Sequence, residues 1–300
     1  MEGLRTRKRK NPNYDFVPKT KKLKVIKNSI EVCCLKCSTL YNKEDEHFCQ
    51  CKTGLINIGN SCYINSVFQV FADLMVPLYI TSDSQLGLMI KSLRSYSEQP
   101  ISTEIVLTEL DHLWEHKNVQ EDAHEFFIAM LAAFNGSVFQ FSTQSECFCE
   151  SCNLSFIGDL KEDNTFHMMI DGSTLQEQIN GSMEEILADC PNCTWPKLTC
   201  YKTIIKPPEI LVVKMNRFQF NQTTGNASKV SSKVEIPQNV EIGTKRYSLS
   251  AVILHKSRSL RYGHYTTYFH RKKILIDDEV VFYNKTLKLD HAHFYIAFYS

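Results

Sequence analysis

One cysteine of this chain stands where a thiol becomes reactive. Residues 54–66 read GLINIGNSCYINS, and the apolar residues that follow Cys62 recur at helical spacing. Asn60 and Ser61 are residue types that favour the N-cap of a helix, so the pattern places Cys62 in the first turn. There the helix dipole and the unpaired N–H groups favour the thiolate, which is the nucleophilic form. The alternative is a buried structural cysteine beside a glycine turn.

A base and a carboxylate that suit this thiol lie far along the chain. His264 opens an alternating stretch that is typical of a strand, and Asp277 and Asp278 close the next one. If the two strands form a hairpin that turns near residues 270 and 271, His264 lies opposite Asp277. A histidine oriented by a carboxylate is the partner that a cysteine nucleophile requires. The alternative is a surface histidine next to a solvated acidic turn.

Four further cysteines have the spacing of a metal site. Cys149 and Cys152 form one C-x2-C pair, and Cys190 and Cys193 form another. Thiolates paired at this spacing bind tetrahedral zinc, and four of them leave no open position for a substrate. We therefore expect one structural Zn2+ ion, the alternative being four buried free cysteines.

A second cysteine-rich segment lies upstream, at residues 31–53, and is too short and polar to have a core of its own. Cys34 and Cys37, together with two of His47, Cys49 and Cys51, could hold one zinc ion in tetrahedral coordination. The ligand candidates are Cys34, Cys37, His47, Cys49 and Cys51. A small zinc knuckle and a set of free thiols both remain open at this point.

The composition is that of an ordinary globular protein, with 43% hydrophobic and 22% charged residues among 300. This excludes a disordered or collagen-like chain. No apolar run approaches the ~18 residues of a membrane span, and none follows the N-terminal charges as in a secretory signal. We expect a soluble intracellular protein, without membrane contact, whose 12 cysteines stay reduced. Disulfides are then the weaker interpretation, and Cys147 and Cys200 are spares beside the zinc pairs.

The net charge of +1 conceals a basic arm. Residues 1–28 carry ten lysines and arginines against two acids, so the rest of the chain is mildly acidic. We expect residues 1–30 to be disordered. Their basic clusters, Arg7–Lys10 and Lys19–Lys22, resemble a two-part nuclear import signal. The alternative is a solvated tail.

The elements that must position these side chains change character along the chain. Helices are predicted from Cys62 to about Pro77, at 102–114 and at 121–134, where apolar residues recur at helical spacing. Strands are predicted beyond residue 139, at 202–205, 210–215, 247–255, 264–270, 274–276 and 294–299. Helices followed by strands favour an α+β fold.

Five motifs, in order, resemble those of the ubiquitin-specific proteases, which are papain-like cysteine deubiquitinases. They are residues 54–66, Val119–Phe127 (VQEDAHEFF), Lys206–Phe218, Tyr247–Tyr268 and Ala292–Tyr299. The resemblance implies a papain-like fold with a helical thumb, a β palm and zinc-bearing β fingers. It also implies a catalytic domain at 54–300, which follows the basic arm at 1–30 and the zinc knuckle at 31–53.

Residue by residue, the resemblance implies a catalytic role for four side chains. Cys62 is then the nucleophile, His264 the general base and acid, and Asp277 the group that orients the histidine. Asn57, five residues before the cysteine, would donate its amide to the tetrahedral oxyanion. Asp278 stands where some relatives polarise the histidine, so it competes with Asp277 for that role.

Three more residues are implied in substrate binding. Asp122 and Glu125 would face the basic C-terminal tail of ubiquitin, although acids at the start of a helix also complement its dipole. Tyr265 would wall the narrow channel that admits the Gly-Gly end of that tail.

The function implied is thiol-dependent hydrolysis of the isopeptide bond after the C-terminal glycine of ubiquitin. The alternative is a catalytically silent scaffold that binds ubiquitin. The segment His112–Leu131 resembles the SAGA-type histone deubiquitinase branch of the family. This implies histone H2B as the substrate, adaptor subunits of a coactivator complex as partners, and a nuclear location, with the cytoplasm as the alternative.

Overall fold

The chain forms two compact units, Met1–Cys49 and Gln50–Ser300. The computed structural model describes residues 31–33, 40–42, 52–78, 83–95, 97, 99–116, 118–181, 183–186, 188–221, 226–257 and 262–300. In the first unit this part is an antiparallel pair of strands, β1 (Glu31–Cys33) and β2 (Leu40–Asn42). The basic arm, the import signal and the ligand candidates of the zinc knuckle lie outside the described residues and stay predictions.

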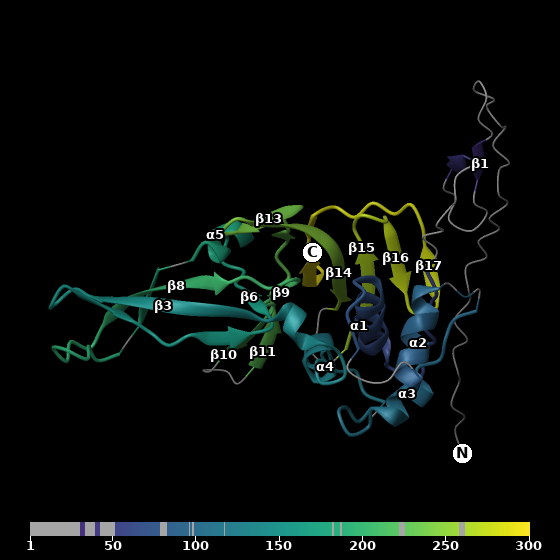
Figure 1. Cartoon of the computed structure of the whole chain (residues 1–300), viewed down its shortest axis with the longest axis horizontal. Helices are drawn as coiled ribbons and strands as arrows, with labels where there is room; N and C mark the ends of the chain where they lie inside the picture. The colour runs from purple at the N-terminus through teal and green to yellow at the C-terminus, as the bar shows by residue number, and fades with distance from the viewer. Residues whose placement is uncertain are drawn as a thin grey trace, which may run out of the picture. The chain divides into compact units, whose positions relative to one another are not determined.

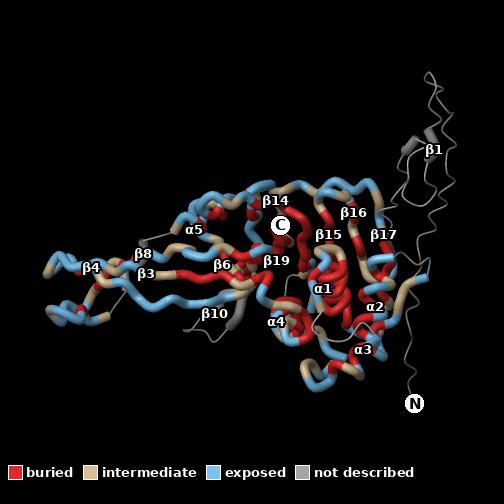
Figure 2. The backbone as a smooth tube through the Cα atoms, in the orientation of Figure 1, coloured by how far each residue is buried: buried red, intermediate tan, exposed pale blue. Residues whose placement is uncertain are grey.

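The second unit begins with a group of helices (Figure 1). They are α1 (Cys62–Asp73), α2 (Gln85–Arg94), α3 (Glu104–Glu109) and α4 (Ala123–Met130). Helix α1 is buried along almost its whole length and contacts α2, α4 and strand β15 (His264–Phe269) (Figure 2). Its Phe71 ring meets Phe127 of α4 and Phe134 just beyond it. This helical group is the thumb.

The helices are shorter than the periodicity predicts. The prediction for 102–114 is wrong at its C-terminal end, because α3 stops at Glu109 and a turn follows in which Trp114 N–H bonds to Leu110 O. The first helix leaves its predicted path before Pro77: Met75 has a φ of 55° and is 62% exposed, so it does not join the buried face. Helix α2 was not predicted at all.

The palm is a sheet with eight strands among the described residues, in the order β17-β16-β15-β14-β19-β9-β6, with β13 paired to β14. The remaining bounds are β6 (Phe166–Met168), β9 (Leu211–Met215), β13 (Asn239–Ile242), β14 (Lys245–Lys256), β16 (Ile274–Asp277), β17 (Val280–Phe282) and β19 (Phe294–Tyr299). All pairs are antiparallel except β6 with β9. The strand predictions for the C-terminal half are confirmed to within a few residues.

Both faces of this sheet are covered, which explains the long apolar runs in its central strands. In β14, Ala251 and Ile253 face the helices of the thumb, while Val252 and Leu254 join a second cluster on the other face. The second cluster includes the short helix α5 (Leu175–Ile179), whose first turn is closed by a capping box between Thr174 and Glu177.

The fingers are a second sheet, of order β4-β3-β8-β7, with β5 paired to β3. Its strands are β3 (Phe141–Cys149), β4 (Leu154–Ile157), β5 (Lys161–Asp163), β7 (Met183–Ile186) and β8 (Leu198–Lys206). Figure 1 shows β3 and β8 as long neighbouring strands. Cys147 lies opposite Cys200 on this pair, and the two are joined in a disulfide. The expectation that these two cysteines stay reduced is wrong in this structure, because the strand register brings their sulfurs together.

One buried cation ties the end of the palm to the loops around it. Arg217 has no exposed surface, and its guanidinium donates to the carbonyls of Phe294, Val230 and Ser232. Burial lowers the pKa of Arg217 to about 10, so it stays charged at neutral pH. The remaining short elements of this unit are η1 (Gly136–Phe139), β10 (Phe218–Asn221), β11 (Asn226–Lys229), β12 (Val234–Glu235) and β18 (Asp290–His291).

The prediction of an α+β fold with thumb, palm and fingers is confirmed. Across the described residues, each helix is too short or too polar to span a bilayer.

Candidate active site

Helix α1 begins at Cys62, as the spacing of its apolar residues predicts. Of the two predicted N-cap residues, Ser61 holds the position, but neither side chain caps the helix. Ser61 occupies the N-cap position, but its hydroxyl accepts from the backbone N–H of Ile58 (3.0 Å) rather than from the helix. The first-turn position of the thiol, which is 3% exposed, is thus set by the loop before it.

That loop, residues 57–61, folds around the side chain of Asn57. Asn57 Oδ1 accepts from the N–H groups of Gly59 (3.1 Å) and Ser61 (3.2 Å) and from the Ser61 hydroxyl (3.3 Å). Gly59 and Asn60 have φ values of 105° and 51°, a region that glycine and asparagine tolerate best. The amide oxygen of Asn57 is therefore held inside the loop, and its NH2 group faces outward.

Strands β15 and β16 bring the histidine and the carboxylate together, although not in the predicted register. Thr267 lies opposite Ile276, so the hairpin is shifted by two residues and His264 is diagonal to Asp277. A shift of two keeps both side chains on the same face of the sheet. His264 Nε2 is hydrogen-bonded to Asp277 Oδ1.

The electrostatics of this pair match that contact. The hydrogen bond to Asp277, followed by the one to the Cys62 thiol, raises the pKa of His264 from 6.5 to about 10. The hydrogen bond to His264 in turn lowers the pKa of Asp277 below its ordinary value. The structure thus joins Cys62, His264 and Asp277 in one chain of contacts, and the imidazolium form is favoured at neutral pH.

Asp278 faces the loop of residues 54–61, the nucleophile loop, which precedes the proposed nucleophile Cys62. Its Oδ2 accepts from Asn57 Nδ2 (2.8 Å), its Oδ1 from Asn65 Nδ2 (2.9 Å), and its backbone carbonyl from the Leu55 N–H (2.9 Å). A φ of 50° at Asp278 turns the chain between β16 and β17 and makes these contacts reachable. Asn65, 2% exposed on α1, was missed by the sequence reasoning, although it belongs to the same motif as Cys62.

The same junction explains the glycine that opens the motif. A Cβ at Gly54 would lie 2.3 Å from the carbonyl oxygen of Glu279, so only glycine lets the two backbones approach. The nucleophile loop and the β16–β17 turn are therefore packed backbone to backbone.

Two of the predicted substrate-binding residues lie at the start of α4 and the third lies next to His264 on β15, and their settings differ. Asp122 is the N-cap of α4, accepting from the His124 N–H (2.7 Å) and from the hydroxyl of Tyr295. Glu125 is exposed in the first turn, where desolvation and then the charge of Asp122 raise its pKa. Tyr265 is only 3% exposed and its ring stacks on His255 at 4.3 Å, so it packs within the core.

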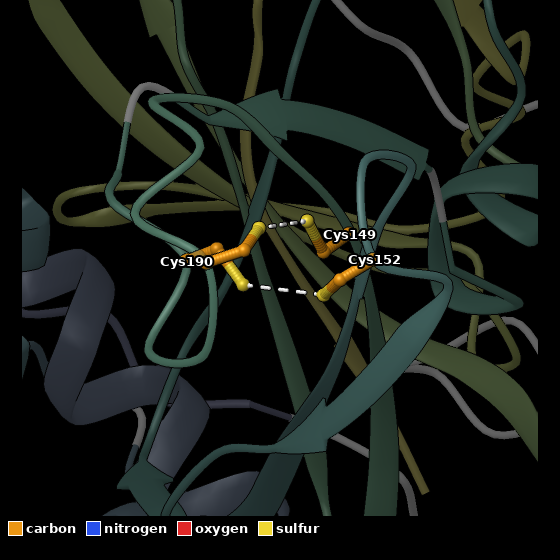
Figure 3. A group of neighbouring side chains, drawn as sticks. Cys149, Cys152 and Cys190 are labelled. Atoms are coloured by element: carbon orange, nitrogen blue, oxygen red, sulfur yellow. Dashed lines mark hydrogen bonds between the residues drawn. The ribbon is translucent and has the colours of Figure 1, made fainter.

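The four predicted zinc ligands lie together at the end of the fingers, with all sulfurs within 4.8 Å of one another (Figure 3). Two sulfur separations, Cys149 to Cys193 and Cys152 to Cys190, are 3.6 and 3.7 Å. Zn–S bonds of about 2.3 Å place the sulfurs of a tetrahedral site ~3.8 Å apart. The four thiols therefore fit one tetrahedral Zn2+ ion, whose chemistry with four thiolates is structural.

Taken together, the site can perform acyl transfer. It offers a thiol at a helix N-terminus, a histidine in contact with it, a carboxylate that orients the histidine, and an exposed amide on the adjoining loop.

Comparison with known proteins points to one family. The family model described as ubiquitin carboxyl-terminal hydrolase matches residues 53–299. Ubiquitin carboxyl-terminal hydrolase 26 of Arabidopsis thaliana is 23% identical over 276 residues, covering 73% of this chain and 25% of the relative. Ubiquitin carboxyl-terminal hydrolase 17-like protein D of Mus musculus is 26% identical over 304 residues, covering 82% and 54%. This chain thus spans between a quarter and about half of these relatives.

Solved structures agree on the fold. The SAGA Ubp8/Sgf11/Sus1/Sgf73 DUB module bound to ubiquitin aldehyde matches with a TM-score of 0.68 at 19% identity, over 83% of this chain and 69% of the other. A second structure of this module, bound to monoubiquitin, matches with a TM-score of 0.66, also at 19% identity, over 83% and 68%. Because the family model covers most of the chain and the fold agrees, this chain belongs to the ubiquitin carboxyl-terminal hydrolase family.

Proposed function

We propose that this chain is a cysteine deubiquitinase that hydrolyses the isopeptide bond after the C-terminal glycine of ubiquitin. The observation that carries the proposal is the contact chain from Cys62 through His264 to Asp277, assembled from α1, β15 and β16. The family membership and the ubiquitin-bound structural neighbours support ubiquitin as the substrate.

In this mechanism the Cys62 thiolate attacks the isopeptide carbonyl, and the carbonyl oxygen becomes an oxyanion. Asn57 Nδ2 uses one hydrogen for Asp278 and keeps a second for the oxyanion. His264, protonated and held by Asp277, gives its proton to the leaving lysine amine. Water then attacks the acyl-enzyme, with His264 as the base, and releases ubiquitin.

Asp122 and Glu125 are proposed to attract the basic tail of ubiquitin. Asp122 is already used as a cap and as the acceptor of Tyr295, so it can attract cations through its charge without leaving these partners. Glu125 is exposed one turn further on and is free to rotate toward an arginine of the tail. Tyr265 is proposed to shape the channel from behind, because its ring is packed in the core.

The fingers are proposed to hold one structural Zn2+ ion on Cys149, Cys152, Cys190 and Cys193. The supporting observation is the tetrahedral spacing of their sulfurs. Bound there, zinc would join the turn after β3 to the turn before β8, which fixes the far end of the sheet.

A nuclear role on histone H2B, with adaptor subunits of a coactivator complex, is the finer proposal. Its support is the resemblance of residues 112–131 to the SAGA-type branch and the basic clusters of residues 7–22. In the solved module with the same fold, Ubp8 is accompanied by the subunits Sgf11, Sus1 and Sgf73.

The alternative function is a scaffold that binds ubiquitin without cleaving it. Such a chain has no need for a paired His264 and Asp277 or for an outward-facing Asn57 amide, and both features are present. These features favour the enzyme.

The nucleophile is tested by Cys62→Ser. We expect cleavage of a fluorogenic ubiquitin C-terminal amide to be abolished, while binding of ubiquitin, measured by calorimetry, stays nearly unchanged because one atom is replaced.

Asn57→Ala should slow turnover by roughly a hundredfold if its amide serves the oxyanion. Cys147→Ser, which breaks the Cys147–Cys200 disulfide in the fingers but changes none of the proposed catalytic residues, is the control and should stay active. Near-wild-type turnover in Cys62→Ser contradicts the mechanism, and a wild type that binds ubiquitin but neither cleaves it nor reacts with a C-terminal electrophile supports the scaffold.

The choice between the two aspartates is tested by the pH profile. Asp277→Asn removes the largest cause of the raised His264 pKa, so the descending basic limb of kcat/KM should move to lower pH, while Asp278→Asn should leave that limb in place. The raised pKa of His264 adds to the free energy of unfolding in full below pH 6.5, and this stabilisation is lost as the pH rises through about 10. The lowered pKa of Asp277 adds stability above pH 3.8, and this stabilisation is lost as the pH falls below that value. Asp277→Asn should therefore destabilise most near pH 4 to 6.5. The opposite pattern for the two variants would assign the polarising role to Asp278.

The metal is tested on the full chain by elemental analysis. We expect one zinc per chain from the fingers, lost in Cys149→Ala and Cys190→Ala, with a lowered melting temperature because the turns lose their link. Cys200→Ser leaves the four ligands in place and should keep this zinc. A second zinc that disappears in Cys34→Ala would support the N-terminal knuckle, and an absence of zinc from the wild type would refute both sites.

The nuclear proposal is tested with a fluorescent fusion of the full chain. We expect the fusion to leave the nucleus when four residues of the two basic clusters are replaced by alanine: Arg9, Lys10, Lys21 and Lys22. Replacement of Lys24 and Lys27 is the control for charge alone. An unchanged distribution, or no preference of the purified chain for monoubiquitinated H2B nucleosomes with adaptors added, would remove this proposal and leave the deubiquitinase intact.

A further inference from the structure

The nucleophile loop is clamped from outside as well as from inside. Gly59 and Asn60 both have positive φ, and for Asn60, which carries a side chain, this conformation costs free energy unless its surroundings hold it. Asn57 supplies the inner contacts. From outside, His116 Nε2 lies 3.0 Å from the carbonyl oxygen of Gly59, and Asn60 Nδ2 donates to the carbonyl of Asn118 (2.7 Å).

The direction of these hydrogen bonds is settled by the partners of His116. The Gly59 carbonyl can only accept, so His116 Nε2 carries a proton, and in the neutral imidazole Nδ1 is then the acceptor. The hydroxyl of Tyr63 lies 3.3 Å from Nδ1 and donates there. The same hydroxyl accepts from Trp114 Nε1 at 3.1 Å. One relay therefore runs from Trp114 through Tyr63 and His116 to Gly59.

The relay starts from rigid parts of the molecule. Tyr63 is fully buried as the second residue of α1, directly after the nucleophile. Its ring packs edge-on against Phe126 (5.7 Å) and Trp114 (6.1 Å). Desolvation raises the pKa of Tyr63 to about 12, so its hydroxyl keeps the proton that it donates. The ring of His116 is thereby fixed in one tautomer and one orientation.

We infer that His116 is a positioning residue for the cleavage reaction, acting through the Gly59 carbonyl to hold the loop that presents the Asn57 amide and the Cys62 thiol. This inference deepens the proposed function and rests on it. His116 touches no reacting atom. Its effect comes from the peptide that it holds, because an oxyanion donor displaced by about 1 Å loses much of its stabilising contact.

The surroundings of His116 make this role testable by chemical rescue. The ring lines a cavity of about 380 Å3 together with Ile58, Leu107 and Asn118, so a small molecule can reach its position. Imidazole has one N–H donor and one nitrogen acceptor and can replace the missing ring. 1-Methylimidazole has the acceptor but no N–H, so it cannot donate to Gly59.

The experiment compares wild type, His116→Gly and His116→Gln in the full chain, using a fluorogenic ubiquitin C-terminal amide. We expect His116→Gly to lower kcat by roughly tenfold to a hundredfold with KM nearly unchanged, because the loop and not ubiquitin binding is affected. Imidazole should restore a large part of kcat, and 1-methylimidazole should not. His116→Gln, which keeps an N–H donor, should retain more activity than His116→Gly. His112→Gly, an exposed histidine of the same segment, is the matched control and should be unaffected.

The relay itself is tested by Tyr63→Phe, which removes the hydroxyl that orients the ring. Tyr63→Phe should lower kcat less than His116→Gly, and the double variant should be no slower than His116→Gly alone, because both changes break one unit. Additive losses in the double variant would contradict the relay.

A second readout does not depend on catalysis. Amide hydrogen exchange of residues 57–62 in the free protein should speed up in His116→Gly and return toward wild type with imidazole. If exchange and kcat are both unchanged in His116→Gly, the inference is overturned while the proposed function stands. If wild type fails to cleave ubiquitin but exchange responds as expected, the clamp stands and the proposed function fails.

Discussion

The structure depends on the close approach of two backbone segments, the loop before Cys62 and the turn after Asp277. Asp278 connects them with one backbone and two side-chain contacts, to Leu55, Asn57 and Asn65. The glycine at position 54 is the condition for this approach, since any side chain would collide with Glu279. The thiol of Cys62 comes from the thumb and the imidazole of His264 from the palm. The distance between the two side chains therefore depends on the contacts between the loop and the turn.

Asp277 and Asp278 contact different groups because of the geometry of the strand that they end. Asp277 ends β16, where its side chain shares a face with His264, while the positive φ at Asp278 turns the next carboxylate toward the amides of the loop. The His264–Asp277 hydrogen bond and the Asn57 amide, which is the proposed oxyanion donor, are thus coupled through one peptide bond. A change in the turn is expected to affect both halves of the site together.

The proximity of Cys62, His264 and Asp277 could be predicted because the sequence signals that place them are local. A helix start is visible at Cys62, and a hairpin with period two puts His264 and Asp277 on one face even when its register is predicted wrongly by two residues. In the fingers, β4 and β5 were not predicted, because they are mostly exposed and carry no sustained alternation of apolar residues. The Cys147–Cys200 disulfide and the role of Asn65 depend on contacts between distant segments, which no spacing in the sequence reveals.

The central position of strand β19 has a consequence for how the palm sheet folds. All six of its residues are buried, and it lies between β14 and β9, both of which precede it in the chain. Because a central strand uses both of its edges, β9 and β14 have no partner on that side while the ribosome is still making residues 294–299. The strand that is made after all the other palm strands is therefore the one that closes the sheet in its middle. Until then the nascent chain carries two open strand edges that chaperones or neighbouring chains can bind.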